Sequence, residues 1–186
     1  MTKSALVVLA EGFEEIEAVA PIDVLRRAGV DVTVASVEGP VVKGAHDVAV
    51  QADTTLAAVT GRVFDMIVLP GGIPGANNLA ASAVLSEMLK KQHAERRAIA
   101  AICASPAVVL HPLGLLGGQK ASCYPSFQQD LDEHNRTDER LTIGEKLITA
   151  AGPGVAVEFA LALVEFLKGG KKAEELAEGM LVEGNR

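Results

Sequence analysis

The sequence predicts an α/β fold in which a mostly parallel sheet carries helices on both faces. Aliphatic runs alternate with helical patterns from one end of the chain to the other, as in repeated strand–helix units. Hydrophobic residues make up 49% of the chain and aromatic residues only 3%, a mixture that suits aliphatic strands buried under helices. Because the 186 residues contain no internal repeat or linker, we expect a single domain over residues 1–186.

The first strand–helix–strand unit has clear boundaries. Residues 5–9 form a continuous aliphatic run, which predicts a buried strand. Residues 14–28 repeat apolar positions at helical spacing, and Gly29 follows them as a glycine that ends the helix. The aliphatic residues 30–35 predict the second strand.

The middle of the chain continues the alternation. Residues 41–43 and 48–50 predict a hairpin or a short edge pair. Residues 65–69 predict another buried strand, which ends at a Pro-Gly-Gly turn. A helix is expected from about residue 77 to 92.

The second half supplies two further strands and the remaining helices. Strands are expected at 98–102 and 147–150, and helices directly after Cys103 and over 155–167. The polar stretch 128–140 predicts a solvated helix and loop. The tail 171–182 has apolar residues at helical spacing, so it should dock on the body or on a partner.

Charge and cysteine content exclude several classes of protein. The net charge of −7, with scattered basic residues, argues against a dedicated nucleic-acid or anionic-membrane surface. Two cysteines, Cys103 and Cys123, are too few for a disulfide framework and lack the spacing of metal ligands. No apolar stretch reaches the roughly 18 residues that span a bilayer, and the N-terminus predicts a strand, not a signal peptide. We therefore expect a soluble cytoplasmic protein without a metal.

Cys103 is the strongest candidate for a reactive residue. It ends an apolar strand and is followed by Ser105, a preferred N-cap, and Pro106, a preferred first helical residue. A helix that begins there would lower the pKa of the thiol and make it a nucleophile near neutral pH. The arrangement is that of a nucleophile elbow. The alternative is a buried and inert core cysteine.

Glycine turns at the carboxyl ends of several strands could line one crevice. Ligands bind beyond these ends in an open parallel sheet. The sequence around Gly71 and Gly72 matches neither a dinucleotide fingerprint nor a Walker A loop, so we expect no nucleotide cofactor. The backbone N–H groups of Gly72 and Ala104 could instead form an oxyanion hole. Alternatively, each glycine only turns the chain.

A thiolate reaction also needs a group that carries protons. Glu14, Glu15 and Glu17 crowd the start of the first helix, where acidic residues usually serve only the helix dipole. A carboxyl group buried beside Cys103 would have a raised pKa and could carry a proton at neutral pH. Spacing does not choose among the three. None of the four histidines is placed to pair with Cys103.

These residues together resemble the ThiJ/PfpI superfamily, and within it the branch of Parkinson-disease-linked protein deglycases. The matching segments are, in chain order, Ala5-Leu6-Val7-Val8-Leu9-Ala10, Gly12, Glu14-Glu15-Ile16-Glu17, Asp23-Val24-Leu25-Arg26-Arg27-Ala28-Gly29, Val68-Leu69-Pro70-Gly71-Gly72, Ala100-Ala101-Ile102-Cys103-Ala104, Gly152-Pro153-Gly154 and Glu158-Phe159-Ala160-Leu161. The likeness extends over nearly the whole chain.

The resemblance implies a fold and roles for individual residues. The fold is a flavodoxin-like three-layer sandwich, the assembly a homodimer, and the enzyme needs no cofactor. Cys103 is the nucleophile, and Glu17 is the acid that hydrogen-bonds it. The oxyanion site falls on the backbone N–H groups of Gly72 and Ala104, and Gly71 and Tyr124 complete the substrate-binding set.

Two positions depart from the family pattern. Tyr124 stands before Pro125 where many relatives have histidine, and a phenol is a poor base near neutrality. His46 stands where relatives have a loop arginine, which weakens an anion-binding role. Cys123 is a second oxidisable thiol or a packing residue. The sequence leaves open whether His46 or His134 reaches the site across a dimer.

The resemblance implies a glyoxalase and deglycase that converts methylglyoxal or glyoxal, free or as early adducts of proteins and nucleotides, to 2-hydroxy acids. In this role the protein would protect against carbonyl and oxidative stress. The alternative is an oxidative-stress sensor and redox-regulated chaperone with little catalysis, in which Cys103 forms a sulfinate. Protease activity is the weaker third hypothesis, because Tyr124 occupies the position of the base.

Overall fold

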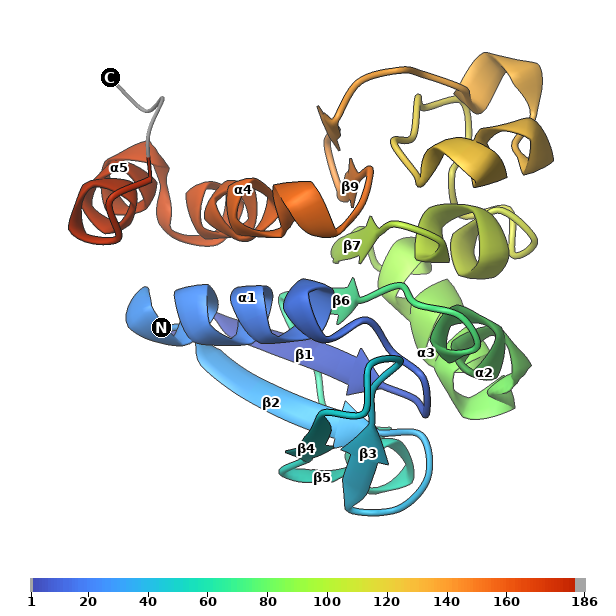
Figure 1. Cartoon of the computed structure of the whole chain (residues 1–186), viewed down its shortest axis with the longest axis horizontal. Coiled ribbons are helices and arrows are strands. Elements are labelled where there is room, and N and C mark those ends of the chain that lie inside the picture. Colours follow the sequence, from blue (N-terminus) through green and yellow to red (C-terminus); the bar gives the residue numbers. More distant parts are fainter. Residues whose placement is uncertain (1, 183–186) are drawn as a thin grey trace.

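A seven-stranded sheet forms the centre of the protein, and the computed structural model describes it within residues 2–182 (Figure 1). The spatial order of the strands is β5-β2-β1-β6-β7-β9-β8. All neighbours pair in parallel except β8, which is antiparallel to β9. Their bounds are β1 (Ser4–Leu9), β2 (Asp31–Ser36), β5 (Thr54–Thr55), β6 (Met66–Leu69), β7 (Ala98–Ile102), β8 (Leu141–Ile143) and β9 (Leu147–Ala150). A separate hairpin pairs β3 (Val41–Lys43) with β4 (Ala49–Gln51).

Helices cover both faces of the sheet, as the sequence predicts for a flavodoxin-like α/β arrangement. One layer contains α1 (Glu15–Arg27), α4 (Ala156–Lys168) and α5 (Gly170–Gly179). The other contains α2 (Gly75–Ala81) and α3 (Ala83–Ala94). In Figure 1 these two layers lie on opposite sides of β1, β6 and β7.

Alternation along each strand divides the apolar residues between two cores. Ala5, Val7 and Leu9 of β1 pack with the α1 and α4 side, whereas Leu6 and Val8 pack with the α2 and α3 side. All five are fully buried, which explains why the strand is a continuous aliphatic run.

The helix expected over residues 77–92 is two helices, and this prediction is therefore wrong. Ser82 adopts an extended backbone (φ −76°, ψ 105°) between α2 and α3. Its Oγ accepts a hydrogen bond from the N–H of Leu85 at 3.2 Å, so it caps α3. The cap satisfies an N–H group that a continuous helix would have bonded internally.

The segment after Cys103 also differs from the expected α-helix. Residues Pro106–Leu110 form a single π-helical turn, in which Pro106 takes the expected first position. Ser105 does not cap it: its backbone is helical (φ −63°, ψ −34°), and its Oγ donates to the carbonyl oxygen of Pro70 at 2.5 Å. Ser105 therefore joins the turn after β7 to the turn after β6.

The polar stretch 128–140 contains short 3-10 turns and loop instead of the expected solvated helix. Two residues of the stretch are buried, Leu131 at 2% and the polar Asn135 at 1% exposure. The Asn135 side-chain amide donates to the carbonyl oxygens of Gly117 and Gln119 at 3.0 and 2.6 Å. This buried amide fixes the stretch to the preceding loop.

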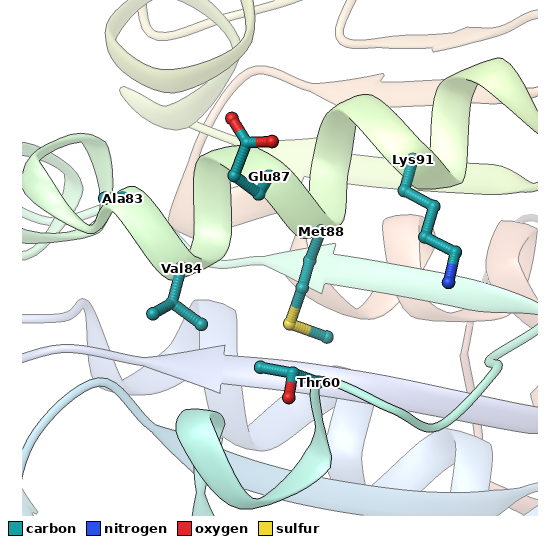
Figure 2. Close-up of a pocket in the computed structure, with 6 residues that line it drawn as sticks. All are labelled: Thr60, Ala83, Val84, Glu87, Met88 and Lys91. Atoms are coloured by element: carbon teal, nitrogen blue, oxygen red, sulfur yellow. The ribbon is translucent and has the colours of Figure 1, made fainter.

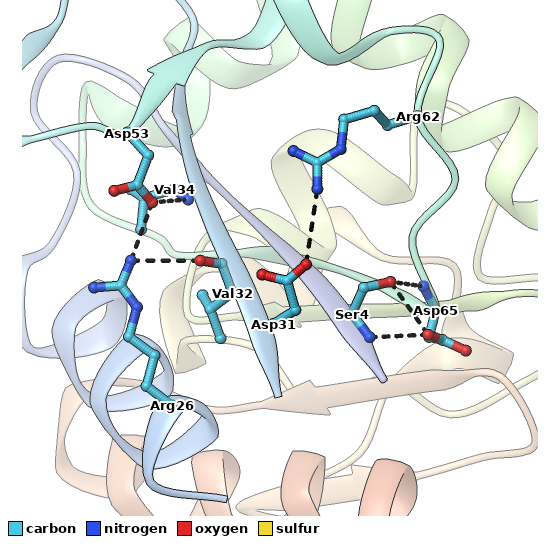
Figure 3. Close-up of polar contacts among 8 residues, drawn as sticks. All are labelled: Ser4, Arg26, Asp31, Val32, Val34, Asp53, Arg62 and Asp65. Carbon is cyan, nitrogen blue, oxygen red and sulfur yellow. Dashed lines mark hydrogen bonds and ion pairs between the residues drawn. The ribbon is translucent and has the colours of Figure 1, made fainter. Parts of the chain in front are cut away.

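Polar contacts anchor β1 and β2 to the segments beside them (Figure 3). The Asp53 carboxylate accepts hydrogen bonds from the N–H of Val34 at 2.8 Å and from the guanidinium of Arg26 at 3.0 Å. The backbone N–H of Ser4 donates to the Asp65 carboxylate at 2.9 Å. Within residues 2–182, no helix has both the length and the apolar composition to cross a membrane.

Candidate active site

Cys103 lies at the carboxyl end of β7 in a left-handed backbone conformation, with φ 63°. Its N–H donates to the carbonyl oxygen of Ala150 at 2.9 Å, and its own carbonyl accepts from the N–H of Tyr124 at 2.9 Å. A non-glycine residue in this conformation costs about 1–2 kcal/mol. The backbone bonds on both sides hold the residue there, which gives the sharp turn expected of a nucleophile elbow.

Glu17 is the acidic residue that reaches this turn. Its side chain, on α1, is fully buried, and Oε2 accepts a hydrogen bond from the N–H of Gly71 at 2.8 Å. The other oxygen, Oε1, has no hydrogen-bond partner among the described residues. A carboxyl group with one unsatisfied buried oxygen strongly favours its protonated form.

Gly71 separates Glu17 from Cys103 and permits their close approach. A Cβ atom on Gly71 would lie 2.6 Å from Cβ of Cys103, 2.7 Å from Oε2 of Glu17 and 3.0 Å from N of Ala104. Any side chain at this position would push the acid away from the thiol.

The two titratable groups perturb each other. Burial raises the pKa of Glu17 to about 7, against the lowering effects of the adjacent Cys103 thiol and of the hydrogen bond from the Gly71 N–H. Burial and the ionised Glu17 carboxylate raise the pKa of the Cys103 thiol to about 12. The expected lowering of this pKa by a helix N-terminus is therefore wrong while Glu17 is ionised. When Glu17 holds the proton, its negative charge and its acceptor role are removed, and burial remains as the cause that raises the pKa of the thiol.

The backbone N–H groups of Gly72 and Ala104 are directed at the Cys103 sulfur, and both lower its pKa by hydrogen bonding. Gly72 has φ 89°, and a Cβ there would lie 2.4 Å from N of Glu14. Glycine is therefore required for the turn after β6 to pack against the backbone before α1. Two N–H groups that face a sulfur atom could also stabilise an oxyanion formed beside it.

The other two acidic residues have structural roles. Glu14 caps α1, because its Oε2 accepts from the N–H of Glu17 at 2.8 Å. Glu15 is buried, and its carboxylate accepts from the backbone N–H of His46 at 2.6 Å and from His46 Nδ1 at 2.9 Å. A longer contact joins it to the N–H of Val48 at 3.4 Å. Glu15 thus binds the loop between β3 and β4 to the start of α1, a long-range role that its sequence position does not reveal.

Tyr124 reaches the site through its backbone. Its N–H bonds to Cys103, and its ring packs on Gly152, where a Cβ atom would lie 3.2 Å from Cδ2 of the ring. The side chain is 45% exposed. Tyr124 is therefore fixed to the turn at Cys103 by its backbone, and its ring lies on Gly152 with part of its surface accessible.

His46 and Cys123 interact with other residues. The His46 side chain is 72% exposed, and the Glu15 carboxylate raises its pKa. Burial, with a smaller effect from Asp130, raises the pKa of Cys123 to about 12. Cys123 packs in the core on the α2 and α3 side, and its Sγ lies 3.6 Å from the Tyr124 carbonyl oxygen.

One group of side chains between residues 2 and 182 has the composition of a cation site. Potential ligand atoms of Glu14, Glu15 and His46 lie within 4.8 Å of one another. The carboxylates of Glu14 and Glu15 already accept backbone N–H groups, so these contacts explain the cluster without a metal.

An apolar groove lies apart from Cys103, between α3 and the segment before β6 (Figure 2). Val84, Met88 and Lys91 point from α3 toward the side where Thr60 lies. The groove measures about 400 Å³. It includes no residue of the Cys103 site.

Comparisons with known proteins agree over most of the chain. The model of the DJ-1/PfpI family matches residues 3–166. The chain is 44% identical to Protein dj-1beta of Drosophila melanogaster over 100% of both chains. It is 38% identical to Glutathione-independent glyoxalase DJR-1.2 of Caenorhabditis elegans, with 94% of each covered. With Protein DJ-1 homolog A of Arabidopsis thaliana it shares 46% identity over 99% of this chain and 48% of that protein, so it spans about half the length of that relative.

The fold agrees with a solved structure. The structure of Toxoplasma gondii DJ-1, described as oxidized, superimposes with a TM-score of 0.97 at 44% identity. The superposition covers 98% of this chain and 100% of that one.

Proposed function

The chain belongs to the DJ-1/PfpI family, and from this premise we propose that it is a cofactor-independent glyoxalase and deglycase of the cytoplasm. Its substrates would be methylglyoxal or glyoxal, free or as early adducts on proteins and nucleotides, and its products 2-hydroxy acids. One relative carries the name of a glutathione-independent glyoxalase. The observation that carries the proposal is a Cys103 sulfur between a buried acid with a pKa of about 7 and two backbone N–H groups.

The reaction begins when Cys103, as a thiolate, adds to the aldehyde carbon of the substrate. A C–S bond forms, and the aldehyde oxygen becomes an oxyanion that the N–H groups of Gly72 and Ala104 stabilise. Protonated Glu17 then donates its proton to this oxygen. The product is a hemithioacetal, and Glu17 is now a carboxylate.

Glu17 next moves a proton between the two substrate carbons. Its carboxylate removes the proton from the carbon bound to sulfur, which gives an enediolate. The hydroxyl proton on that carbon's oxygen moves to the neighbouring oxygen, and Glu17 returns its proton to the neighbouring carbon. The result is a thioester of the 2-hydroxy acid. Water cleaves the thioester and releases the acid and the Cys103 thiol, so the overall change is an internal oxidation and reduction of the substrate.

An early adduct on an amine reaches the same hemithioacetal by a different first step. Attack of the thiol on the hemiaminal carbon forms the C–S bond and breaks the C–N bond, and the proton goes to the departing amine. The repaired amine leaves, and the hemithioacetal proceeds as before. A thiol adduct reacts in the same way.

The first test is formation of lactate from methylglyoxal by the wild type, Cys103→Ser and Glu17→Gln proteins, after exclusion of contaminating glyoxalase. Lactate from the wild type alone supports the proposal. Adduct formation on Cys103 without lactate rejects it.

A second candidate function is an oxidative-stress sensor and chaperone. A peroxide would oxidise Cys103 to the sulfinate, and protonated Glu17 would donate a hydrogen bond to it. The pKa of about 7 for Glu17 favours this, because the acid holds a proton near neutrality. Peroxide titration of the Cys103 mass, together with client aggregation assays on Cys103→Ala, separates this function from catalysis.

We also propose that the protein is a homodimer. Ile16, on α1, is 56% exposed, and Val48, in the adjoining loop, is 54% exposed. Glu15 links these two segments, which supports a continuous apolar surface there. A single species of twice the chain mass in light scattering supports this assembly, and a monomer at micromolar concentration rejects it.

A further inference from the structure

A cavity of about 490 Å³ opens at the amino ends of β7 and β9. Cys103 follows the opposite end of β7, and the four residue steps from Ile99 to Cys103 span about 13 Å of strand. The cavity is therefore separate from the candidate active site. Its size lies within the range of small-molecule sites in proteins.

The floor of the cavity is apolar. Ile99 of β7, Leu147 of β9 and the loop residues Leu115 and Leu116 line it, and all four are buried. Gln119 adds an amide whose Nε2 donates to the Leu147 carbonyl oxygen at 3.1 Å. A ligand that enters would place a hydrocarbon part on these side chains.

The rim of the cavity is positively charged, although the chain as a whole has a net charge of −7. Arg96 and Lys146 contribute two cations, and Glu145 contributes one carboxylate, which pairs with Arg96. Lys146 has no carboxylate within ion-pair distance in the described part of the chain, and its Nζ lies 5.5 Å from the ring centroid of Phe166. With His93 neutral, the rim has a net charge of about +1.

Arg96 occupies a backbone position that normally selects glycine. The N–H of Arg96 bonds to the carbonyl of His93 and the N–H of Arg97 bonds to that of Gln92, which is the Schellman pattern at the end of α3. Arg96 has φ 53°, and the left-handed conformation costs a non-glycine residue stability. The strained position therefore keeps a guanidinium group at the rim, where glycine would be more stable.

We propose that this cavity binds a small amphipathic carboxylate, with its hydrocarbon part on the apolar floor and its charged group between Arg96 and Lys146. The mixed lining, an apolar floor with few convergent polar groups, is that of a ligand site.

Hexanoate and its uncharged isostere hexanamide test the proposal on the full ¹⁵N-labelled protein at low ionic strength. Hexanoate should shift the amide signals of Ile99, Gln119 and Leu147 in a saturable way. Hexanamide should bind at least about tenfold more weakly, because it lacks the charge.

The variant Arg96→Gly separates binding from stability. It removes the guanidinium and also relieves the backbone strain, so hexanoate affinity should fall at least about fivefold while Tm rises by about 2–4 °C. Leu181→Gly is the matched control. Leu181 has φ 57° in the same hydrogen-bond pattern at the end of α5, far along the chain from the cavity. Its replacement should raise Tm and leave the affinity unchanged.

Lys146→Gln provides an independent variant without a backbone effect, and we expect at least about a fivefold loss of affinity. The proposal is overturned if hexanamide binds as well as hexanoate, or if Arg96→Gly and Lys146→Gln both bind like the wild type. It is also overturned if hexanoate produces no saturable shift up to about 20 mM, because even a small ligand should occupy a formed site at that concentration.

Discussion

Glu17 and Cys103 hold one proton between them over a wide pH range. Burial raises the pKa of Glu17 to about 7, and burial with the Glu17 carboxylate raises that of Cys103 to about 12. Removal of the proton from either group leaves a negative charge that opposes ionisation of the other. Between these two values the shared proton resides on the thiol, and protonation of Glu17 removes a charge that opposes formation of the thiolate. This coupling determines the behaviour of variants at both positions.

Replacement of Glu17 by Gln should reduce lactate formation at least about 100-fold, because the amide cannot carry a proton between the substrate atoms. Cys103 should remain open to alkylation, and the pKa of its thiol should fall because the carboxylate charge is absent. The pH dependence of iodoacetamide labelling measures the second effect. Turnover at the wild-type rate would exclude Glu17 as the proton carrier.

Stability should decrease as the pH rises through the range from 4.5 to about 7. The raised pKa means that folded Glu17 binds its proton more tightly than unfolded Glu17, so the unfolded state loses it first. The shift corresponds to about 3 kcal/mol of unfolding free energy lost by pH 8. Urea unfolding at pH 5 and pH 8, compared between wild type and Glu17→Gln, isolates this contribution. Equal pH dependence of the two proteins would contradict the assigned pKa.

Gly71→Ala should cost about 1–3 kcal/mol of unfolding free energy, because its Cβ overlaps Cys103 and Glu17. Activity should fall with it, since the acid and the thiol are forced apart. Gly39→Ala is the control, because no atom lies within 4 Å of a Cβ at that position. If the two variants unfold at the same urea concentration, the close approach at Gly71 is not a constraint.

Glu15→Gln should weaken the attachment of the loop that contains His46. The neutral amide replaces a buried carboxylate that accepts backbone and imidazole N–H groups, which costs about 1–3 kcal/mol. The pKa of His46 should also fall toward 6.5, since the carboxylate raises it. An NMR titration of the imidazole checks this, with Glu11→Gln as the control. An unchanged His46 titration would show that the pair does not persist in solution.

The sequence predicts the layers of the fold well because the strands are buried on both faces. Such strands are continuous aliphatic runs, which can be recognised from the local sequence alone. The break at Ser82 is different, since a serine inside a helical pattern caps a new helix only when the backbone turns there. The residue types also do not predict the left-handed backbone of Cys103 and Arg96, because cysteine and arginine do not favour that conformation.

The candidate site is only partly predictable for a related reason. The strand end and the sharp turn at Cys103 follow from local sequence, but the choice of Glu17 over Glu14 and Glu15 rests on the resemblance to a family. The structure supplies the physical basis: Glu17 contacts the turn after β6, Glu14 caps its own helix, and Glu15 holds a loop 31 residues away in sequence. Such contacts depend on tertiary structure, which spacing along one helix does not encode.

The two edge strands of the central sheet, β5 and β8, are shorter than the other strands of this sheet in the described residues. β5 has two residues and β8 has three, so each border offers few unpaired backbone groups to a passing chain. Either edge of the central sheet therefore offers few N–H and C=O groups with which a strand of another folded copy could pair. Copies that associate in the folded state through the central sheet would therefore meet mainly through side chains, and amyloid-like stacking of this sheet requires β5 or β8 to detach first and uncover β2 or β9.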